Sequence, residues 1–229
     1  MMDAARGQRP FFFHHHSGYR RNPFGALDDD EWADVALLPE VVTAVLHHPV
    51  HIQLLGPMGV GKSSVLLAIQ RELRGRGQQV AYEYIPAGQR SMRTSLSGLD
   101  VFCLDEAQRL SWRWRRRLRR AQGRVRLCLG SHADLSAQFA PGAVVTIDLA
   151  RHVTVAYWQQ TLARRLAYFA LPDAPAATLS PDAVEFLYTT FGCDLRAGEY
   201  FLYEVWQGLA TAVPLTAADL QRRLQEVGD

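Results

Sequence analysis

Short apolar runs recur along the first two thirds of the chain, separated by polar stretches or by segments with helical spacing. Each run has the length of a β-strand, and one of them is apolar almost throughout, which is typical of a parallel strand covered on both faces. The runs predicted as strands are 51–55, 79–85, 99–104, 124–130 and 143–149. Strands that alternate with helices predict a doubly wound α/β domain with a five-stranded parallel sheet.

Beyond Arg151 the apolar positions follow helical spacing only. Ser180 and Pro181 form an N-cap followed by a first-turn proline, and Gly192 ends the helix that they start. We expect about four helices in this part and no further strand. The predicted divisions are a flexible N-terminal tail over 1–21, an α/β core over 22–150 and a small all-helical subdomain over 151–229.

Composition adds limits to this picture. The chain has 229 residues, of which 48% are hydrophobic and 21% charged, so it can bury a substantial core. Its net charge is only +2, so binding to nucleic acid would require a local cluster of basic residues. No apolar run is long enough to span a membrane, and the three cysteines form no close pair. We therefore expect a cytoplasmic protein.

A glycine-rich segment lies between the first predicted strand and the helix that follows it. It matches the G-x-x-x-x-G-K-[ST] phosphate loop in the strand-to-helix context that this loop requires. Its backbone N–H groups can turn toward a phosphate, Lys62 can reach the β- and γ-phosphates, and the Ser63 hydroxyl can bind Mg²⁺. The predicted nucleotide-binding residues are Gly56, Pro57, Met58, Gly59, Val60, Gly61, Lys62, Ser63 and Ser64. The sequence therefore predicts a site for a nucleoside triphosphate.

Two carboxylates, Asp105 and Glu106, directly follow the apolar strand at 99–104. Ligands of open α/β sheets bind at the carboxyl ends of the strands, so we expect both to face the phosphate loop. Asp105 can hold the Mg²⁺ shell, and Glu106 can orient and deprotonate an attacking water. The simpler alternative is an acidic start to a helix, although it leaves the preceding strand unexplained.

Polar residues at two other positions complete the candidate site. Ser131 follows the next strand and can contact the γ-phosphate or the attacking water, with His132 as the second choice. Ser131 can instead serve only as a helix cap. Arg196 lies in the first turn of a helix in the helical subdomain, where it opposes the helix dipole slightly, and we expect it to point across the cleft toward the nucleotide. A solvated arginine is the alternative.

These motifs together resemble those of the AAA+ ATPases, over roughly residues 22–210. The resemblance implies ATP and Mg²⁺ as ligands, Walker A at 56–63, Walker B at Asp105 and Glu106, sensor 1 at Ser131 and sensor 2 at Arg196. It also implies that Pro23 and Phe24 line the adenine pocket.

A finer resemblance concerns the branch of the AAA+ class. The segment Asn22-Pro23-Phe24 and the run from Asp105 to Leu110 are similar to the ExeA/TniB/TnsC-like ATPases of secretion and DNA transposition. In one respect the chain departs from the class, because Ala133 to Leu149 contains no arginine to act as a finger on a neighbour's nucleotide. Arg151, Arg90 and Arg93 are the alternatives, or a partner supplies the finger, or hydrolysis is slow.

An arginine-rich segment follows the two carboxylates. On a helix, Leu110, Trp114, Leu118 and Ala121 would form a stripe facing the core, while Arg109, Arg113, Arg116 and Arg120 would form a second stripe. Duplex phosphates are the natural partner of such a charge cluster, with a subunit interface or a solvated face as alternatives. The predicted nucleic-acid contacts are Arg113, Arg115, Arg116, Arg119 and Arg120.

Two functional hypotheses follow from these features. The first is an ATP-dependent regulator that forms homo-oligomers on double-stranded DNA and recruits or activates a partner enzyme on another chain, as transposition ATPases do. The second is a nucleotide-gated protein-interaction switch in secretion, defence or assembly, without nucleic acid. The arginine helix favours the first, and the missing arginine finger favours the second.

Overall fold

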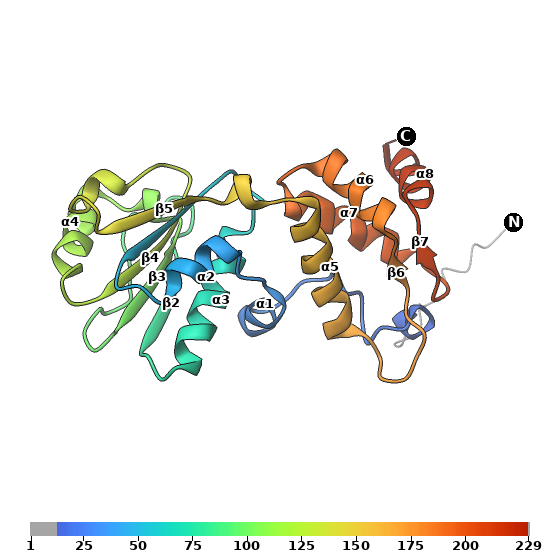
Figure 1. The fold of residues 1–229 in the computed structure, drawn as a ribbon, viewed down its shortest axis with the longest axis horizontal. Coiled ribbons are helices and arrows are strands. Elements are labelled where there is room, and N and C mark those ends of the chain that lie inside the picture. Colours follow the sequence, from blue (N-terminus) through green and yellow to red (C-terminus); the bar gives the residue numbers. More distant parts are fainter. Residues whose placement is uncertain (1–12, 229) are drawn as a thin grey trace, which may run out of the picture.

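The computed structural model describes residues 13–228, with side chains from 14 to 226. The α/β core and the helical subdomain lie end to end (Figure 1). The core sheet has the strand order β2-β3-β4-β1-β5, with every neighbouring pair parallel. Its strands are β1 (His51–Leu55), β2 (Val80–Tyr84), β3 (Val101–Asp105), β4 (Arg126–Ser131) and β5 (Val144–Asp148). The predicted five-stranded parallel sheet is confirmed.

Helical segments connect and flank these strands. The α-helices of the core are α1 (Asp29–Val35), α2 (Glu40–Leu46), α3 (Lys62–Gly75) and α4 (Trp112–Ala121). Short 3₁₀ turns are η2 (Ala107–Arg109), η3 (Ser136–Gln138) and η4 (Leu149–His152). Within residues 13–228, no helix has both the length and the apolar character needed to cross a bilayer.

The two faces of the sheet belong to separate apolar clusters. On β3, Val101 and Cys103 pack in the cluster that contains α3. Phe102 and Leu104 point the other way, into the cluster that contains Leu118 of α4. This alternation is the period-two pattern of a strand, and both faces are buried because a helix covers each of them.

The helical subdomain contains four α-helices and one small addition to the predicted pattern. The helices are α5 (Val155–Phe169), α6 (Pro181–Phe191), α7 (Leu195–Gln207) and α8 (Ala217–Gly228). The expectation of no strand beyond Arg151 is wrong, because β6 (Thr178–Leu179) and β7 (Pro214–Leu215) pair in parallel. Two residues are too few to produce a readable alternation, and the pair forms only because tertiary folding brings these segments together.

The segment before the core belongs to the helical subdomain. Phe13–Ser17 forms a 3₁₀ helix, η1, and Tyr19 is buried with its hydroxyl bonded to the Ala177 carbonyl. Arg20 N–H donates to the Phe169 carbonyl at 3.0 Å. The expected flexible tail is therefore wrong for residues 13–21, whereas residues 1–12 lie outside the described part of the chain.

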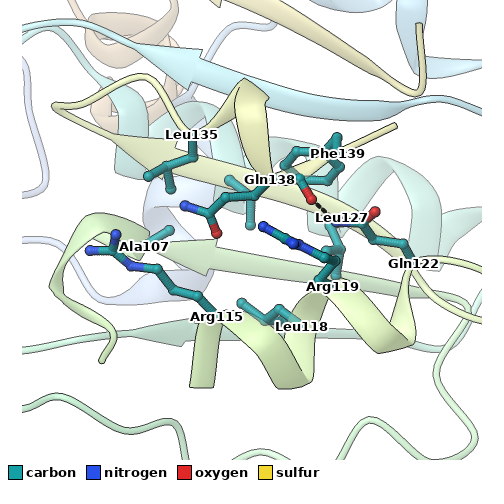
Figure 2. Close-up of a pocket in the computed structure, with 10 residues that line it drawn as sticks. Ala107, Arg115, Leu118, Arg119, Gln122, Leu127, Leu135, Gln138 and Phe139 are labelled. Atoms are coloured by element: carbon teal, nitrogen blue, oxygen red, sulfur yellow. Dashed lines mark hydrogen bonds between the residues drawn. The ribbon is translucent and has the colours of Figure 1, made fainter. Parts of the chain in front are cut away.

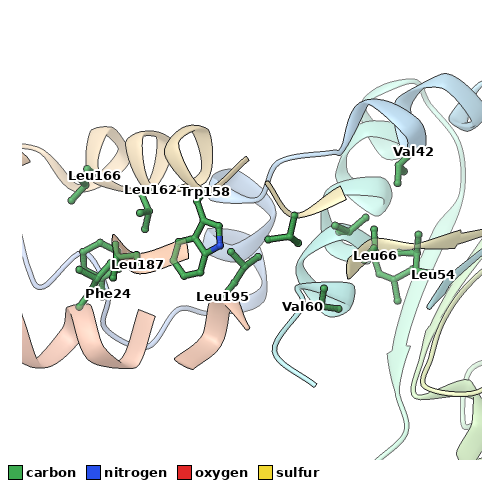
Figure 3. Packing of buried hydrophobic residues seen from close by; sticks show 14 of the residues in the cluster. Phe24, Val42, Leu54, Val60, Leu66, Trp158, Leu162, Leu166, Leu187 and Leu195 are labelled. Atoms are coloured by element: carbon green, nitrogen blue, oxygen red, sulfur yellow. The ribbon is translucent and has the colours of Figure 1, made fainter. Parts of the chain in front are cut away.

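A single apolar cluster joins the core to the helical subdomain. Val60 of the phosphate loop and Leu66 of α3 share it with Trp158 of α5 and Leu195 of α7 (Figure 3). Trp158 is fully buried, and its indole N–H donates to the Gly192 carbonyl at 2.9 Å. This packing fixes the start of α7 next to the phosphate loop.

Candidate nucleotide site

The loop between β1 and α3 is shaped by glycines and by its contact with α7. Gly59 and Gly61 have φ angles of 84° and 92°, in the left-handed region that favours glycine. A Cβ at Gly59 would lie 1.9 Å from Oδ1 of Asp194, the N-cap of α7, and one at Gly61 would lie 3.5 Å from Leu195. The loop can therefore approach the helical subdomain only with glycine at position 59.

Lys62 is the first residue of α3 and is 6% exposed. Its Nζ donates to the carbonyls of Gly56 and Pro57, both at 2.8 Å, so the ammonium lies against the loop itself. Burial lowers the pKa of Lys62, while the carboxylates of Glu106 and Asp105 act in the opposite direction. The buried ammonium is the group here that can pair with a phosphate, whereas the two carboxylates would need a bound cation before a polyanion could approach them.

Asp105 ends β3 and faces the first turn of α3. Its Oδ2 accepts from the Ser63 hydroxyl at 2.5 Å and from the Tyr82 hydroxyl at 3.3 Å, and its Oδ1 accepts from the Glu106 N–H at 2.9 Å. Burial raises the pKa of Asp105, and the hydrogen bond from Ser63 opposes that shift. A Cβ at Gly130 would lie 2.5 Å from Oδ1, so glycine on β4 leaves room for this carboxylate.

Glu106 lies in a backbone conformation that is uncommon outside glycine, with φ 58° and ψ 38°. Its Oε2 accepts from Gln108 at 2.7 Å and pairs with Arg109 at 2.9 Å, while its Oε1 contacts Nε2 of His132 at 3.1 Å. Glu106 is 8% exposed, so the strained turn holds a nearly buried carboxylate among three polar partners.

The two polar residues predicted for sensor 1 are Ser131, the last residue of β4, and His132, which follows it, and their side chains make different contacts. Ser131 is fully buried, and its hydroxyl donates to the Ala133 carbonyl at 2.6 Å and accepts from the Ala133 N–H at 3.1 Å. Both hydrogen bonds of the Ser131 hydroxyl therefore go to the backbone of the following turn, which agrees with the alternative that Ser131 acts as a cap. The His132 ring contacts Glu106 instead. The assignment of sensor 1 to Ser131, with His132 as the second choice, therefore stays a prediction, and of the two side chains only that of His132 contacts Glu106.

Arg196, predicted as sensor 2, lies in the first turn of α7 with an exposed side chain. Its N–H donates to the Gly59 carbonyl at 3.3 Å, and its charge contributes to lowering the pKa of Lys62. Asp194 caps the same helix by accepting from the Ala197 N–H at 3.0 Å. The start of α7 is therefore placed over the phosphate loop by backbone contacts.

The other predicted nucleotide-binding residues differ in their exposure. Met58, at the tip of the loop, is 68% exposed, whereas Val60 is buried. Pro23 and Phe24 are buried within the helical subdomain, where Phe24 packs edge-on against Trp206 with ring centroids 4.9 Å apart. The buried Arg165 donates to the Pro23 carbonyl at 2.6 Å, which attaches this segment to α5.

Sequence reasoning missed several residues that complete the site. Tyr82 reaches Asp105 from β2, and burial raises the pKa of its hydroxyl, with the Asp105 charge acting in the same direction. Gln108 and Arg109 turn back onto Glu106 from η2. Tyr82 lies in the predicted strand at 79–85, but only the pairing of β2 with β3 in the structure places its side chain beside Asp105.

Two of the arginines expected on the surface around α4, Arg109 and Arg115, are engaged elsewhere. Arg109 lies outside α4, in η2, and pairs with Glu106. Arg115 turns inward, where its Nε donates to the Leu110 carbonyl at 2.9 Å and its Nη2 to the Gln108 carbonyl. Arg119 extends over a crevice of about 10 Å³ toward Gln138 (Figure 2). The arginines of α4 with exposed side chains are Arg113, Arg116, Arg117, Arg119 and Arg120.

Comparison with known proteins identifies the fold. No protein-family model matches this sequence, and no curated protein matches it. A variant of RuvB from Thermotoga maritima superposes with a TM-score of 0.59 at 16% identity, over 82% of this chain and 68% of that one. RuvB of the same organism, described as a Holliday junction branch migration motor, gives 0.55 at 17% identity, over 88% and 69%. AMPPCP-bound DnaA from Aquifex aeolicus gives 0.55 at 18% identity, over 83% and 65%.

These similarities and the motif geometry assign the chain the fold of the AAA+ P-loop ATPases. The AAA+ resemblance predicted from the sequence is confirmed at the level of the fold. Its narrower form, the ExeA/TniB/TnsC-like branch, stays a prediction.

Proposed function

We propose that this protein is an ATPase that binds ATP with Mg²⁺, assembles into homo-oligomers on double-stranded DNA, and recruits or activates a partner enzyme on another chain. The observation that carries the nucleotide part is the meeting of Ser63 and Asp105 at 2.5 Å, next to the buried Lys62. The end of the phosphate loop, with Lys62 and Ser63, thus meets the carboxylate of Asp105, which lies far away in the sequence.

Ser63 and Asp105 fit a magnesium site by their chemistry. Mg²⁺ prefers oxygen ligands and is usually held by one or two protein oxygens together with substrate phosphates. The Ser63 hydroxyl and the Asp105 carboxylate offer such oxygens, and the described residues contain no larger cluster of metal-binding side chains. When bound, the ion would neutralise charge on the phosphates.

Glu106 is our candidate for the general base. A carboxylate has about four acceptor positions, and Oε1 of Glu106 is contacted by His132 alone among the described residues. An acceptor position on Oε1 is therefore available to orient a water and take its proton. His132 and Arg109 would act as positioning residues that fix the direction of the carboxylate.

Support for DNA binding comes from α4 and from the neighbours of this fold. The arginines on the outer face of α4 are exposed, and RuvB, one of the structural neighbours, is described as a Holliday junction motor. Arg151, with its side chain 82% exposed at the start of the helical subdomain, is the candidate to reach a neighbouring subunit's nucleotide.

The test is the solution mass of the Glu106→Gln protein with ATP and Mg²⁺, with and without duplex DNA. This change keeps the carbonyl oxygen but removes the base, so ATP should bind and persist. Assembly that requires both ATP and DNA is the expected result. Lys62→Ala is the matched control that should not assemble under any of these conditions.

A second candidate function is a nucleotide-gated switch for protein partners. It is favoured by the absence of arginine between Ala133 and Leu149, since slow hydrolysis suits a switch. Assembly with ATP alone, unaffected by DNA, would support this alternative and overturn the DNA part of the proposal.

A further inference from the structure

A basic groove lies beside the start of α4, and Arg115 lines both this groove and the crevice of Figure 2. It encloses about 580 Å³, within the size range of small-ligand sites. Its walls come from residues 87–90, which follow β2, and from residues 108–112 with Arg115. Neither the proposed magnesium ligands nor the phosphate loop lines it, but Gln108 and Arg109 do, and both also contact Glu106, so the groove adjoins the nucleotide site.

The groove is held in shape by hydrogen bonds to the backbone. Ser111 N–H donates to the Arg90 carbonyl at 3.0 Å, which joins the two walls. Arg115 binds the carbonyls of Gln108 and Leu110 and so fixes the turn before α4. A preformed groove loses less conformational entropy on binding than a flexible one does.

Trp112 is the unusual residue of this groove. It occupies the first position of α4 and is 67% exposed, although tryptophan normally buries most of its large apolar surface. The guanidinium of Arg113 lies 5.7 Å from the centre of its ring. An exposed indole beside a cation offers a flat stacking surface next to a charge that attracts anions.

The positive charge of the groove indicates an anionic ligand. Arg90 lines the groove, and Arg113 lies outside the lining but next to the Trp112 ring. Both have exposed side chains and form no ion pair within residues 13–228. The described residues that line the groove include no aspartate or glutamate. Unpaired arginines together with an exposed aromatic ring are the combination that binds unpaired nucleic acid, because phosphates meet the cations and bases stack on the ring.

We propose that this groove binds an unpaired stretch of nucleic acid, with a base stacked on Trp112 and phosphates on Arg90 and Arg113. The inference rests on the proposed function, since it refines how the protein engages DNA. The exposed arginines further along α4, among them Arg116 and Arg120, are left to contact duplex phosphates. The protein would then distinguish a junction of duplex and single strand from plain duplex.

The test compares the affinity of the full chain for a labelled oligothymidine strand and for a duplex. Trp112→Ala should weaken strand binding by about ten- to hundredfold, the range of one stacking interaction, and change duplex binding less than about twofold. Trp112→Phe should restore most of the affinity, because a smaller ring still stacks. Arg90→Ala should weaken strand binding as well.

Two matched controls make the outcome specific. Arg124→Ala removes an equal charge just after α4, and Tyr200→Ala removes an aromatic ring that is 70% exposed on α7. Neither should change strand binding as Trp112→Ala does. Unchanged strand affinity in Trp112→Ala, or losses as large in both controls, would overturn the groove proposal.

Failure of the groove and failure of the proposed function give different results. If the wild-type chain binds duplex through Arg116 and Arg120 but Trp112→Ala has no effect, only the groove proposal fails. If the wild-type chain binds neither strand nor duplex, both fail. Binding of a polyglutamate peptide at Trp112 in place of the strand would show a protein partner and also reject the proposal.

Discussion

The helices α3 and α4 both follow a parallel strand of the same sheet and cover opposite faces of it, yet they have very different surfaces. α3 has fourteen residues and buries seven of them, whereas α4 has ten and buries only Leu118. The buried residues of α3 are Lys62, Val65, Leu66, Leu67, Ala68, Ile69 and Leu73. Packing fixes α3, the helix that follows the phosphate loop, whereas little packing constrains α4.

The arginines of α4 carry an energetic cost that α3 does not. Arg113, Arg116 and Arg120 lie three and four residues apart on one face, where like charges destabilise a helix by a few tenths of a kcal/mol for each pair. Two other arginines of α4 do have partners, since Arg117 lies 5.0 Å from the Trp114 ring and Arg115 donates to carbonyls of the turn before the helix. The remaining exposed charge is what the proposed DNA partner would neutralise.

The largest predicted difference between α3 and α4 is the loss of ATP affinity when the first residue of α3 is changed. Lys62→Ala should weaken ATP affinity by about thirty- to several-thousandfold, because it removes a buried cation from its site. Replacing Arg116 and Arg120 together by Glu should leave ATP affinity unchanged. Isothermal titration with ATP and Mg²⁺ measures both. An equal loss in the two proteins would show that α4 also supports the nucleotide site.

The packing difference predicts a difference in stability. Leu66→Ala on α3 should cost about 2–5 kcal/mol of unfolding free energy, since Leu66 is fully buried between β-sheet and helix. Leu118→Ala on α4 should cost less, because Leu118 borders the crevice of Figure 2 and α4 can settle inward. Urea titration of both variants checks this. A larger loss for Leu118 would contradict the view that α4 is weakly packed.

The charge difference predicts a salt effect without a stability effect. Arg116→Glu with Arg120→Glu should reduce the slope of log affinity for duplex DNA against log salt by about two, because each arginine is expected to neutralise one phosphate. The unfolding free energy should change by less than about 0.5 kcal/mol for each substitution, as at other exposed positions. Titrations with a fluorescent duplex at several salt concentrations, together with urea unfolding, test the two parts separately.

The smallest predicted effect concerns pH and the carboxylate that faces α3. Burial raises the pKa of Asp105 above its ordinary value of 3.8, so the folded protein binds this proton more tightly than the unfolded chain does. Ionising Asp105 therefore costs stability once the pH rises above its unfolded pKa. Asp105→Asn should be more stable than wild type at pH 7, and this advantage should disappear near pH 3.

Thermal unfolding of both proteins across this pH range measures the difference. ATP turnover should be lost in Asp105→Asn despite the gain in stability, which would identify the carboxylate as functional. An advantage that is equal at pH 3 and pH 7 would mean that ionisation of Asp105 is not its cause.

The sequence by itself determined the parts of this protein that depend on local pattern. The five strands, the phosphate loop from Gly56 to Ser63 and the carboxylates Asp105 and Glu106 were all readable. Apolar runs, glycines that need left-handed backbone and strand ends that meet at one edge of a sheet each leave a short-range signature. Their order along the chain predicted a doubly wound α/β domain, and the motifs on it resembled those of the AAA+ ATPases.

Tertiary structure alone decided the contacts between side chains of different elements. Ser131 and His132 are adjacent in the sequence, and only the turn at Ala133 shows which one is free to meet Glu106. In the sequence Arg115 cannot be told apart from the other arginines of α4, and only the structure shows that it donates to carbonyls of the preceding turn. Likewise, Tyr19 became part of the core only when α5 and the 176–177 segment supplied a surface to bury it. Such contacts depend on the positions of backbone segments far apart in the sequence, and the spacing of apolar and polar residues carries no information about those positions.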